Sequence, residues 1–156
     1  MNFLVIDDDV LVRLDYESQA EDLPQHRFEF AGSSREARGV LNKMALDGVF
    51  SDFDFPGERD SNSGGVEFYK EARRRSPTLL FFFISGHDAT HVLSVLAKNG
   101  ITDVPAENIF SKPMPMAIAT LVHEAEQGYA PRERGTQTVI KTATGPGFLG
   151  NLKFQI

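Results

Sequence analysis

The chain contains no cysteine among its 156 residues, which excludes a disulfide framework and thiolate chemistry. It also lacks a long hydrophobic run, since the longest, Leu79 to Ile84, falls far short of the ~20 residues that a membrane-spanning helix needs. The N-terminus has no basic start and passes from four apolar residues straight into three aspartates, so a secretory signal is not expected. We therefore expect a cytoplasmic protein that does not contact membranes.

Basic charge is scarce and unevenly distributed. The chain has 16 basic and 22 acidic residues, a net charge of −6, which argues against nucleic-acid binding over the whole surface. Apolar residues make up 41%, enough for a globular core, so whole-chain disorder is excluded. After Tyr129 the balance reverses, with four basic residues against one acidic residue between Pro131 and Ile156. This shift predicts a body over residues 1–130 and a C-terminal extension over residues 131–156.

The extension has a pattern of its own. Leu152, Phe154 and Ile156 alternate with polar residues, and Gly145-Pro146-Gly147 has the composition of a turn. A two-stranded hairpin alone is marginal in water, so it would need to pair with the body or with a second copy of the chain. Two interpretations stay open, namely a hairpin docked on the body or forming a homodimer, and a disordered end. Because the extension has 26 residues, we do not expect it to form a helix-turn-helix or winged output domain.

Apolar runs alternate with helical patterns along the body. Leu79 to Ile84 and Phe3 to Ile6 are continuously apolar, as is typical of strands buried on both faces. Ser33 and Glu36 stand at the spacing of a capping box, which predicts a helix start. Five strands that alternate with five helices predict an open, doubly wound α/β fold with a parallel sheet. We expect strands at 3–6, 27–31, 49–53, 79–84 and 108–111, and helices at 10–22, 33–46, 66–75, 89–100 and 116–127.

Polar side chains follow the carboxyl ends of four expected strands. Because these ends lie along one edge of a parallel sheet, we expect the side chains to share one cleft. Two like charges about 4 Å apart repel by about 4 kcal/mol at an effective dielectric of 20, so clustered carboxylates require a cation. Oxygen ligands favour Mg²⁺ or Mn²⁺ over zinc. A site that combines a carboxylate, a hydroxyl, an ammonium group and a divalent ion can accept a phosphoryl group. The residues are Asp7 and Asp8, Asp52 and Asp54, Ser85, and Lys112.

Two neighbouring residues are left out of this expected site. Asp9 immediately precedes the first expected helix, where an aspartate typically caps the helix N-terminus. His87 follows Ser85 by two positions, and we interpret it as a solvent-exposed loop residue.

Four short motifs resemble, in order and spacing, the signature of response-regulator receiver domains. The resemblance covers roughly residues 1–128 and implies the flavodoxin-like strand order 2-1-3-4-5. It implies a stand-alone, phosphorylation-controlled signalling protein whose output is protein–protein binding. The net acidity and the short extension predict no direct contact to nucleic acid. The implied phosphoryl donor is a sensor histidine kinase or a histidine phosphotransfer protein. The motifs are Ile6-Asp7-Asp8, Asp52-Phe53-Asp54-Phe55-Pro56, Ile84-Ser85-Gly86 and Lys112-Pro113.

The resemblance also implies a role for each site residue. Asp52 is the phosphoryl acceptor, and Ser85 and Lys112 hold the phosphoryl oxygens. Water then hydrolyses the acyl phosphate slowly, so the chain is expected to be a phosphoacceptor rather than an enzyme. The implied ligands of Mg²⁺ are Asp7 through a water, Asp8, Asp52 and the backbone carbonyl of Asp54.

The sequence departs from the family pattern at three places. Eight residues, Gly57 to Gly64, separate Pro56 from Gly65, where the family usually has only a few. The connection from Gly100 to Lys112 is also longer than usual. Three residues before Lys112 the family usually has an aromatic switch residue, but here Ile109 occupies that position and Phe110 follows it.

An enzyme is the main alternative. Asp52-Phe53-Asp54 also resembles the nucleophile motif of haloacid-dehalogenase-type phosphatases, which would use both Asp52 and Asp54. In that family the motif lies on the first strand of the domain, whereas two expected strands and two helices precede it here. The acidic motif expected after Lys112 is also absent. A third class, a receiver-like binding module without phosphorylation, is disfavoured because every residue for the chemistry is present.

Overall fold

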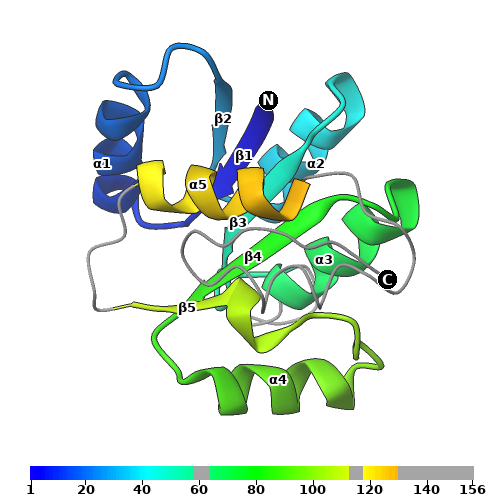
Figure 1. The fold of residues 1–156 in the computed structure, drawn as a ribbon. Helices are drawn as coiled ribbons and strands as arrows, with labels where there is room; N and C mark the ends of the chain where they lie inside the picture. The colour runs from blue at the N-terminus through cyan, green and yellow to red at the C-terminus, as the bar shows by residue number, and fades with distance from the viewer. Residues whose placement is uncertain (58–63, 113–117, 130–156) are drawn as a thin grey trace, which may run out of the picture. The chain divides into compact units, whose positions relative to one another are not determined.

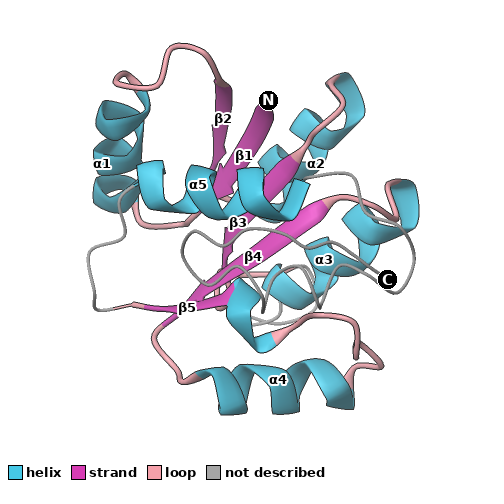
Figure 2. Ribbon diagram, in the orientation of Figure 1, coloured by secondary structure: helices cyan, strands magenta, loops and turns pink. Residues whose placement is uncertain are grey.

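A single parallel sheet organises the described part of the chain (Figures 1 and 2). The computed structural model describes residues 1–57, 64–112 and 118–129. The strand order is β2-β1-β3-β4-β5, and every pair of neighbours is parallel, which confirms the predicted doubly wound sheet. The strands are β1 (Asn2–Ile6), β2 (Arg27–Ala31), β3 (Gly48–Asp52), β4 (Leu80–Ser85) and β5 (Ile109–Ser111).

Helices follow the strands in the predicted alternation. The helix expected at 33–46 ends earlier, at Lys43, and a short 3₁₀ turn, η1 (Ala106–Asn108), precedes β5. The chain forms two compact units, residues 1–122 and 123–156; the sheet belongs to the first. The predicted extension, 131–156, lies outside the described residues, so its interpretation stays a prediction. The helices are α1 (Val10–Ala20), α2 (Ser34–Lys43), α3 (Gly64–Arg75), α4 (Ala89–Lys98) and α5 (Ile118–Tyr129).

Three helix starts are fixed by local side-chain caps. The Asp9 carboxylate accepts hydrogen bonds from the first-turn N–H groups of α1, and Asp88 accepts the His91 N–H of α4 at 2.8 Å. Ser33 Oγ accepts the Glu36 N–H at 3.1 Å, as the capping-box spacing predicts. The Glu36 carboxylate completes this cap by accepting the N–H of Gly32 at 2.6 Å, one residue before the cap. Each such cap stabilises a helix by about 0.5–2 kcal/mol.

The end of α4 is set by a glycine. Gly100 has φ +80°, a left-handed conformation that residues with a Cβ adopt at a cost. Its N–H donates to the Ala97 carbonyl at 3.0 Å, and the Ile101 N–H donates to the Leu96 carbonyl at 2.9 Å. This Schellman pattern satisfies the last carbonyls of α4 and buries Ile101 in the core.

The two faces of the sheet have different cores. On one face, α2, α3 and α4 contribute to a cluster that contains Leu4 and Ile6 of β1. Because side chains alternate along a strand, Phe3 lies on the opposite face. There, five phenylalanines, one from each strand, form a row. Neighbouring ring centroids in the order Phe28, Phe3, Phe50, Phe82 and Phe110 are 5.4, 5.2, 5.6 and 6.0 Å apart.

The start of α3 is a point of close backbone approach. A Cβ on Gly65 would lie 2.5 Å from the Phe53 carbonyl oxygen, one residue beyond the end of β3. We expect Gly65→Ala to lower the free energy of unfolding by about 1–3 kcal/mol because this contact requires backbone displacement. The matched control is Gly39→Ala in α2, where a Cβ meets no atom within 4 Å, and we expect it to stabilise by about 0.5–1 kcal/mol. Urea unfolding of both variants measures this, and equal effects would contradict the close approach.

Candidate functional site at the carboxyl edge of the sheet

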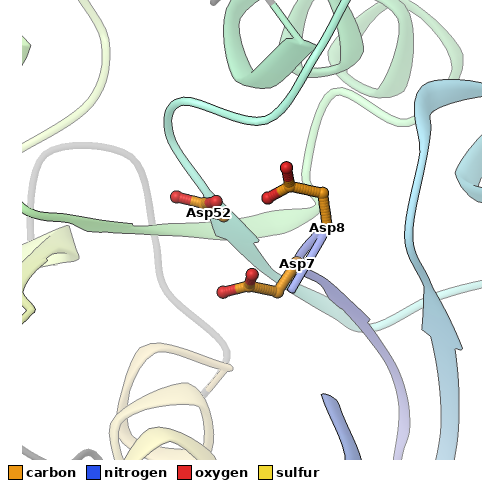
Figure 3. Close-up of side chains that lie close together, drawn as sticks. All are labelled: Asp7, Asp8 and Asp52. Carbon is orange, nitrogen blue, oxygen red and sulfur yellow. The ribbon is translucent and has the colours of Figure 1, made fainter. Parts of the chain in front are cut away.

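Three carboxylates meet where β1 and β3 end. Asp7 and Asp8 follow β1, Asp52 is the last residue of β3, and one oxygen of each lies within 4.8 Å of the others (Figure 3). Asp7 is 2% exposed and Asp52 6%, whereas Asp8 faces solvent. The adjacency of β1 and β3 in the sheet produces this cluster from residues about 45 positions apart.

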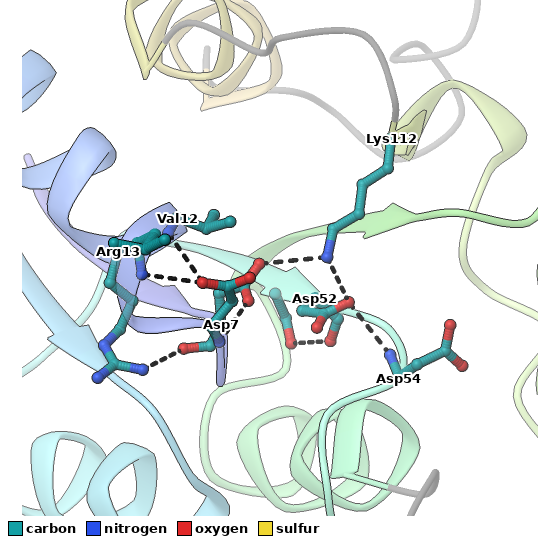
Figure 4. A network of polar contacts seen from close by, with 9 residues as sticks. Asp7, Val12, Arg13, Asp52, Asp54 and Lys112 are labelled. Atoms are coloured by element: carbon teal, nitrogen blue, oxygen red, sulfur yellow. Dashed lines mark hydrogen bonds and ion pairs between the residues drawn. The ribbon is translucent and has the colours of Figure 1, made fainter.

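A single ammonium group lies between the two buried carboxylates. Lys112 follows β5, and its Nζ is 3.3 Å from Asp7 Oδ2 and 3.2 Å from Asp52 Oδ1 (Figure 4). The backbone N–H of Lys112 donates to the Ser85 carbonyl at 2.6 Å, which anchors the base of its side chain beside β4. Lys112 thus contacts the ends of β1, β3 and β4, and its one positive charge is paired with two of the three carboxylates.

The pKa shifts of Asp52 and Lys112 reflect a balance between burial and the neighbouring charges. Burial raises the pKa of Asp52 to about 6; Lys112 opposes this shift and Asp7 adds to it. For Lys112, burial alone would lower the pKa, but the Asp52 and Asp7 carboxylates outweigh it and raise the pKa overall. A divalent cation is therefore a chemically suitable addition, because hard oxygen ligands and uncompensated negative charge are what Mg²⁺ requires. The donor set fits the ion that the sequence predicts.

Backbone contacts hold Asp7 in place. Its Oδ1 accepts the Asp9 N–H at 2.9 Å, and its carbonyl accepts a hydrogen bond from Arg13 Nη1 at 2.7 Å (Figure 4). The Arg13 guanidinium also occupies the space that a Cβ on Gly32 would take. The sequence did not predict a role for Arg13. An arginine on a helix gives no sign of whether its side chain holds a neighbouring segment in place or only faces solvent.

The other two expected residues lie at the end of β4 and in the loop after β3. Ser85 ends β4 and is fully buried, and its Oγ accepts the His87 N–H at 2.9 Å. The Asp54 N–H donates to Asp52 Oδ1 at 3.3 Å. The Asp54 carboxylate lies outside the three-carboxylate cluster, with Oδ2 3.5 Å from His87 Nε2. His87 is an exposed loop residue, as the sequence predicts, and its ring lies beside the site through this contact with Asp54.

The structure places some of the residues at which the sequence departs from the family pattern. Residues 58–63 of the expected insertion lie outside the described residues. Ile109 is half-buried and packs against the cluster beneath α2, α3 and α4. Phe110 belongs to the phenylalanine row on the opposite face, with its ring 6.0 Å from Phe82. The two residues therefore point to different cores and are not interchangeable.

No family model matches the chain, and no curated protein sequence matches it. In contrast, many solved structures share its fold. A response regulator receiver protein from Sinorhizobium medicae is 28% identical with a TM-score of 0.63, over 85% of this chain and 97% of that chain. A CheY-like receiver domain protein from Methanospirillum hungatei is 16% identical with a TM-score of 0.60, over 81% and 94% of the two chains.

A longer protein is also similar. The response regulator RcsB, solved in complex with DNA, is 18% identical with a TM-score of 0.64 over 86% of this chain, but the match spans only 64% of the RcsB chain. Within the described residues, no helix combines the length and apolarity needed to span a membrane. Fold, strand order and the similarity to receiver structures agree with the sequence motifs, and the chain has the fold of response-regulator receiver domains.

Proposed function

We propose that this receiver domain is a phosphorylation switch in which Asp52 accepts the phosphoryl group. The observation that carries the proposal is the Lys112 ammonium, placed 3.2 Å from Asp52 and 3.3 Å from Asp7 in a cluster of three carboxylates. An acceptor carboxylate needs a neighbouring cation that offsets the charge of the incoming oxygens. The arrangement supports phosphoryl transfer to Asp52 and output through binding to another protein.

The residues of the chain have distinct parts in the transfer. A carboxylate oxygen of Asp52 attacks phosphorus, a P–O bond forms, and the P–N bond to the donor imidazole breaks. With a pKa of about 6, Asp52 is mostly ionised at pH 7, as a nucleophile must be. Lys112 balances the charge on the phosphoryl oxygens. Ser85 Oγ accepts the His87 N–H, and its own hydroxyl proton is available to donate to a phosphoryl oxygen.

The proposed ligands of Mg²⁺ or Mn²⁺ are Asp8, Asp52, the backbone carbonyl of Asp54 and, through a water, Asp7. When bound, the ion neutralises negative charge on the phosphoryl oxygens.

A protein donor is supported by the surface beside the site. Val10, Leu11 and Leu14 of α1 are 55%, 76% and 54% exposed, although the sequence places them on one side of the helix. The buried residue of α1 is Tyr16 instead. Three exposed apolar side chains directly after the Asp7–Asp9 segment favour a protein that brings a phosphohistidine to Asp52. We propose a sensor histidine kinase or a histidine phosphotransfer protein.

The phosphatase alternative is not favoured. Its motif would require the Asp54 carboxylate to act on the substrate bound at Asp52. In the structure, that carboxylate is directed to His87 and stands apart from the three-carboxylate cluster. The similar solved structures include receiver domain proteins from Methanospirillum hungatei and Sinorhizobium medicae.

Incubation with a small phosphodonor, followed by intact-mass spectrometry, tests the proposed function. We expect one phosphoryl group per chain with Mg²⁺ or Mn²⁺ and a loss of labelling in EDTA, because the carboxylates repel the donor without a divalent ion. Asp22→Asn, a change at an exposed position, is expected to label like the parent. Labelling that is as fast in EDTA as in Mg²⁺ would rule out the metal-dependent site.

A further inference from the structure

The backbone of Asp7 is held from two sides. Its N–H donates to the Ala31 carbonyl at the end of β2 at 3.1 Å. Its carbonyl accepts a hydrogen bond from Arg13 Nη1 of α1 at 2.7 Å (Figure 4). Hydrogen bonds from ionised donors are shorter and stronger than neutral ones, so the contact with the guanidinium is the stronger of the two.

The carbonyl that Arg13 holds also governs the direction of Asp8. A peptide unit is planar, so the Asp7 carbonyl and the N–H and Cα of Asp8 move together. The Asp8 carboxylate is exposed, and within the described part of the chain no hydrogen bond or ion pair orients it. One of its oxygens nevertheless lies within 4.8 Å of oxygens of Asp7 and Asp52 (Figure 3). The backbone therefore supplies the orientation of Asp8.

We infer that Arg13 is a positioning residue for the divalent cation, an inference that rests on the ligand set of the proposed function. By fixing the Asp7–Asp8 peptide, Arg13 keeps both carboxylates directed toward the ion and so raises the affinity for Mg²⁺. Side chains that orient metal ligands typically contribute about 10–100-fold to metal affinity. Arg13 donates to a backbone carbonyl and is not itself a ligand of the ion.

The charge of Arg13 predicts the opposite effect on binding. A guanidinium beside the Asp7–Asp8 segment repels an incoming divalent cation, so charge alone would make Mg²⁺ bind more tightly once Arg13 is removed. Positioning predicts that the removal of Arg13 weakens the binding of Mg²⁺. The sign of the change in affinity therefore separates the two effects without any measurement of phosphorylation.

Gly32 provides an independent way to move the guanidinium. A Cβ on Gly32 would lie 2.8 Å from Arg13 Cζ and would also overlap Nη1. The backbone of Gly32 lies outside the left-handed region, so alanine is compatible with it. Because the atoms in the way belong to the end of a flexible side chain, we expect the guanidinium to move rather than the backbone. Gly32→Ala therefore displaces the donor from the Asp7 carbonyl, whereas the charge of Arg13 remains.

The experiment is a titration of the full chain with Mg²⁺ alone, measured by isothermal calorimetry. We expect Arg13→Met, which keeps an unbranched apolar side chain without charge or donor, to bind Mg²⁺ about tenfold more weakly than the parent. Arg13→Lys, whose ammonium group can still donate to a carbonyl, is expected to retain most of the affinity. Gly32→Ala is expected to weaken binding by less than Arg13→Met does.

Two controls separate this effect from a general loosening of the fold. Arg74→Met removes an exposed arginine from the last turn of α3 and is expected to leave the affinity for Mg²⁺ unchanged. In the Arg13→Met background, Gly32→Ala is expected to have no further effect, because the group that it displaces is already absent. Thermal melting in EDTA shows whether each variant is folded. Should Arg13→Met fail to fold, Gly32→Ala decides, since it retains the arginine.

The possible failures are distinguishable. A parent chain that binds Mg²⁺ but takes no phosphoryl group from a small phosphodonor would overturn the proposed function alone. A labelled parent whose affinity for Mg²⁺ is matched or exceeded by Arg13→Met and by Gly32→Ala would overturn this inference and leave the function standing. A parent chain that binds no Mg²⁺ would overturn both.

Discussion

Asparagine in place of Asp52 is expected to abolish labelling by a small phosphodonor and, at the same time, to stabilise the metal-free fold above about pH 6. Labelling fails because an amide oxygen is too weak a nucleophile to replace the carboxylate. Stability rises because the amide is neutral at all pH values, whereas the buried carboxylate must be ionised. Asp22→Asn provides the same chemical change at an exposed position and is expected to alter neither property.

The sign follows from the direction of the pKa shift. The pKa of Asp52 is raised from 3.8 to about 6, with burial as the main cause. Between these two pH values, Asp52 therefore keeps its proton in the folded state but has lost it in the unfolded state. The parent is therefore most stable with respect to this group below about pH 4 and loses stability as the pH rises toward 6. The shift corresponds to at most about 3 kcal/mol, so we expect a gain of about 1–3 kcal/mol for Asp52→Asn at pH 8.

Urea unfolding in EDTA at pH 4.5 and pH 8 measures the effect. The gain is expected to shrink at pH 4.5, where the parent carboxyl group is largely protonated in the folded state. If Asp52→Asn accepted the label as the parent does, the assignment of the acceptor would be wrong. If it were less stable than the parent at pH 8, burial would not be the main influence on this carboxyl group.

The sequence is sufficient for the fold because its signals are local. Continuous apolar runs mark the buried strands, and the caps at Asp9, Ser33 and Asp88 mark helix starts through contacts that span only a few residues. Carboxylates at the ends of strands could be assigned to one edge because parallel strands expose equivalent ends on the same side. The meeting of Asp7, Asp8 and Asp52 needed nothing further than this rule.

Features that depend on tertiary contacts could not be predicted. Arg13 reaches the Asp7 carbonyl only once α1 has packed beside β2, and nothing in its own segment signals this. The contact of His87 with Asp54 joins residues 33 positions apart and depends on the geometry of two loops. The exposure of Leu11 and Leu14 in α1 could not be predicted for the same reason, since their spacing on one side of a helix does not show whether another element covers them.

Lys112→Ala is expected to slow phosphorylation by a small phosphodonor about 10²–10³-fold at saturating Mg²⁺, the effect of removing one preorganised charge from a transferring group. The lysine donates to both buried carboxylates, at 3.3 and 3.2 Å, so no other group among the described residues is placed to replace it. Lys98→Ala, in the exposed last turn of α4, is the matched control and is expected to label at the parent rate.

The same variant is expected to be destabilised in a pH-dependent way. Lys112 lowers the pKa of Asp52 against the effect of burial, so its removal raises that pKa further and leaves Asp7 and Asp52 without their shared counter-charge. The metal-free variant should therefore lose about 1–3 kcal/mol relative to the parent at pH 8 and recover as the pH falls toward 4, because protonation removes the repulsion. Added Mg²⁺ should restore part of the loss at pH 8, since the proposed ligands remain. Urea unfolding at both pH values, with EDTA and with Mg²⁺, measures this; a loss that is equal at pH 4 and pH 8 would mean that Lys112 stabilises the fold by packing rather than by charge.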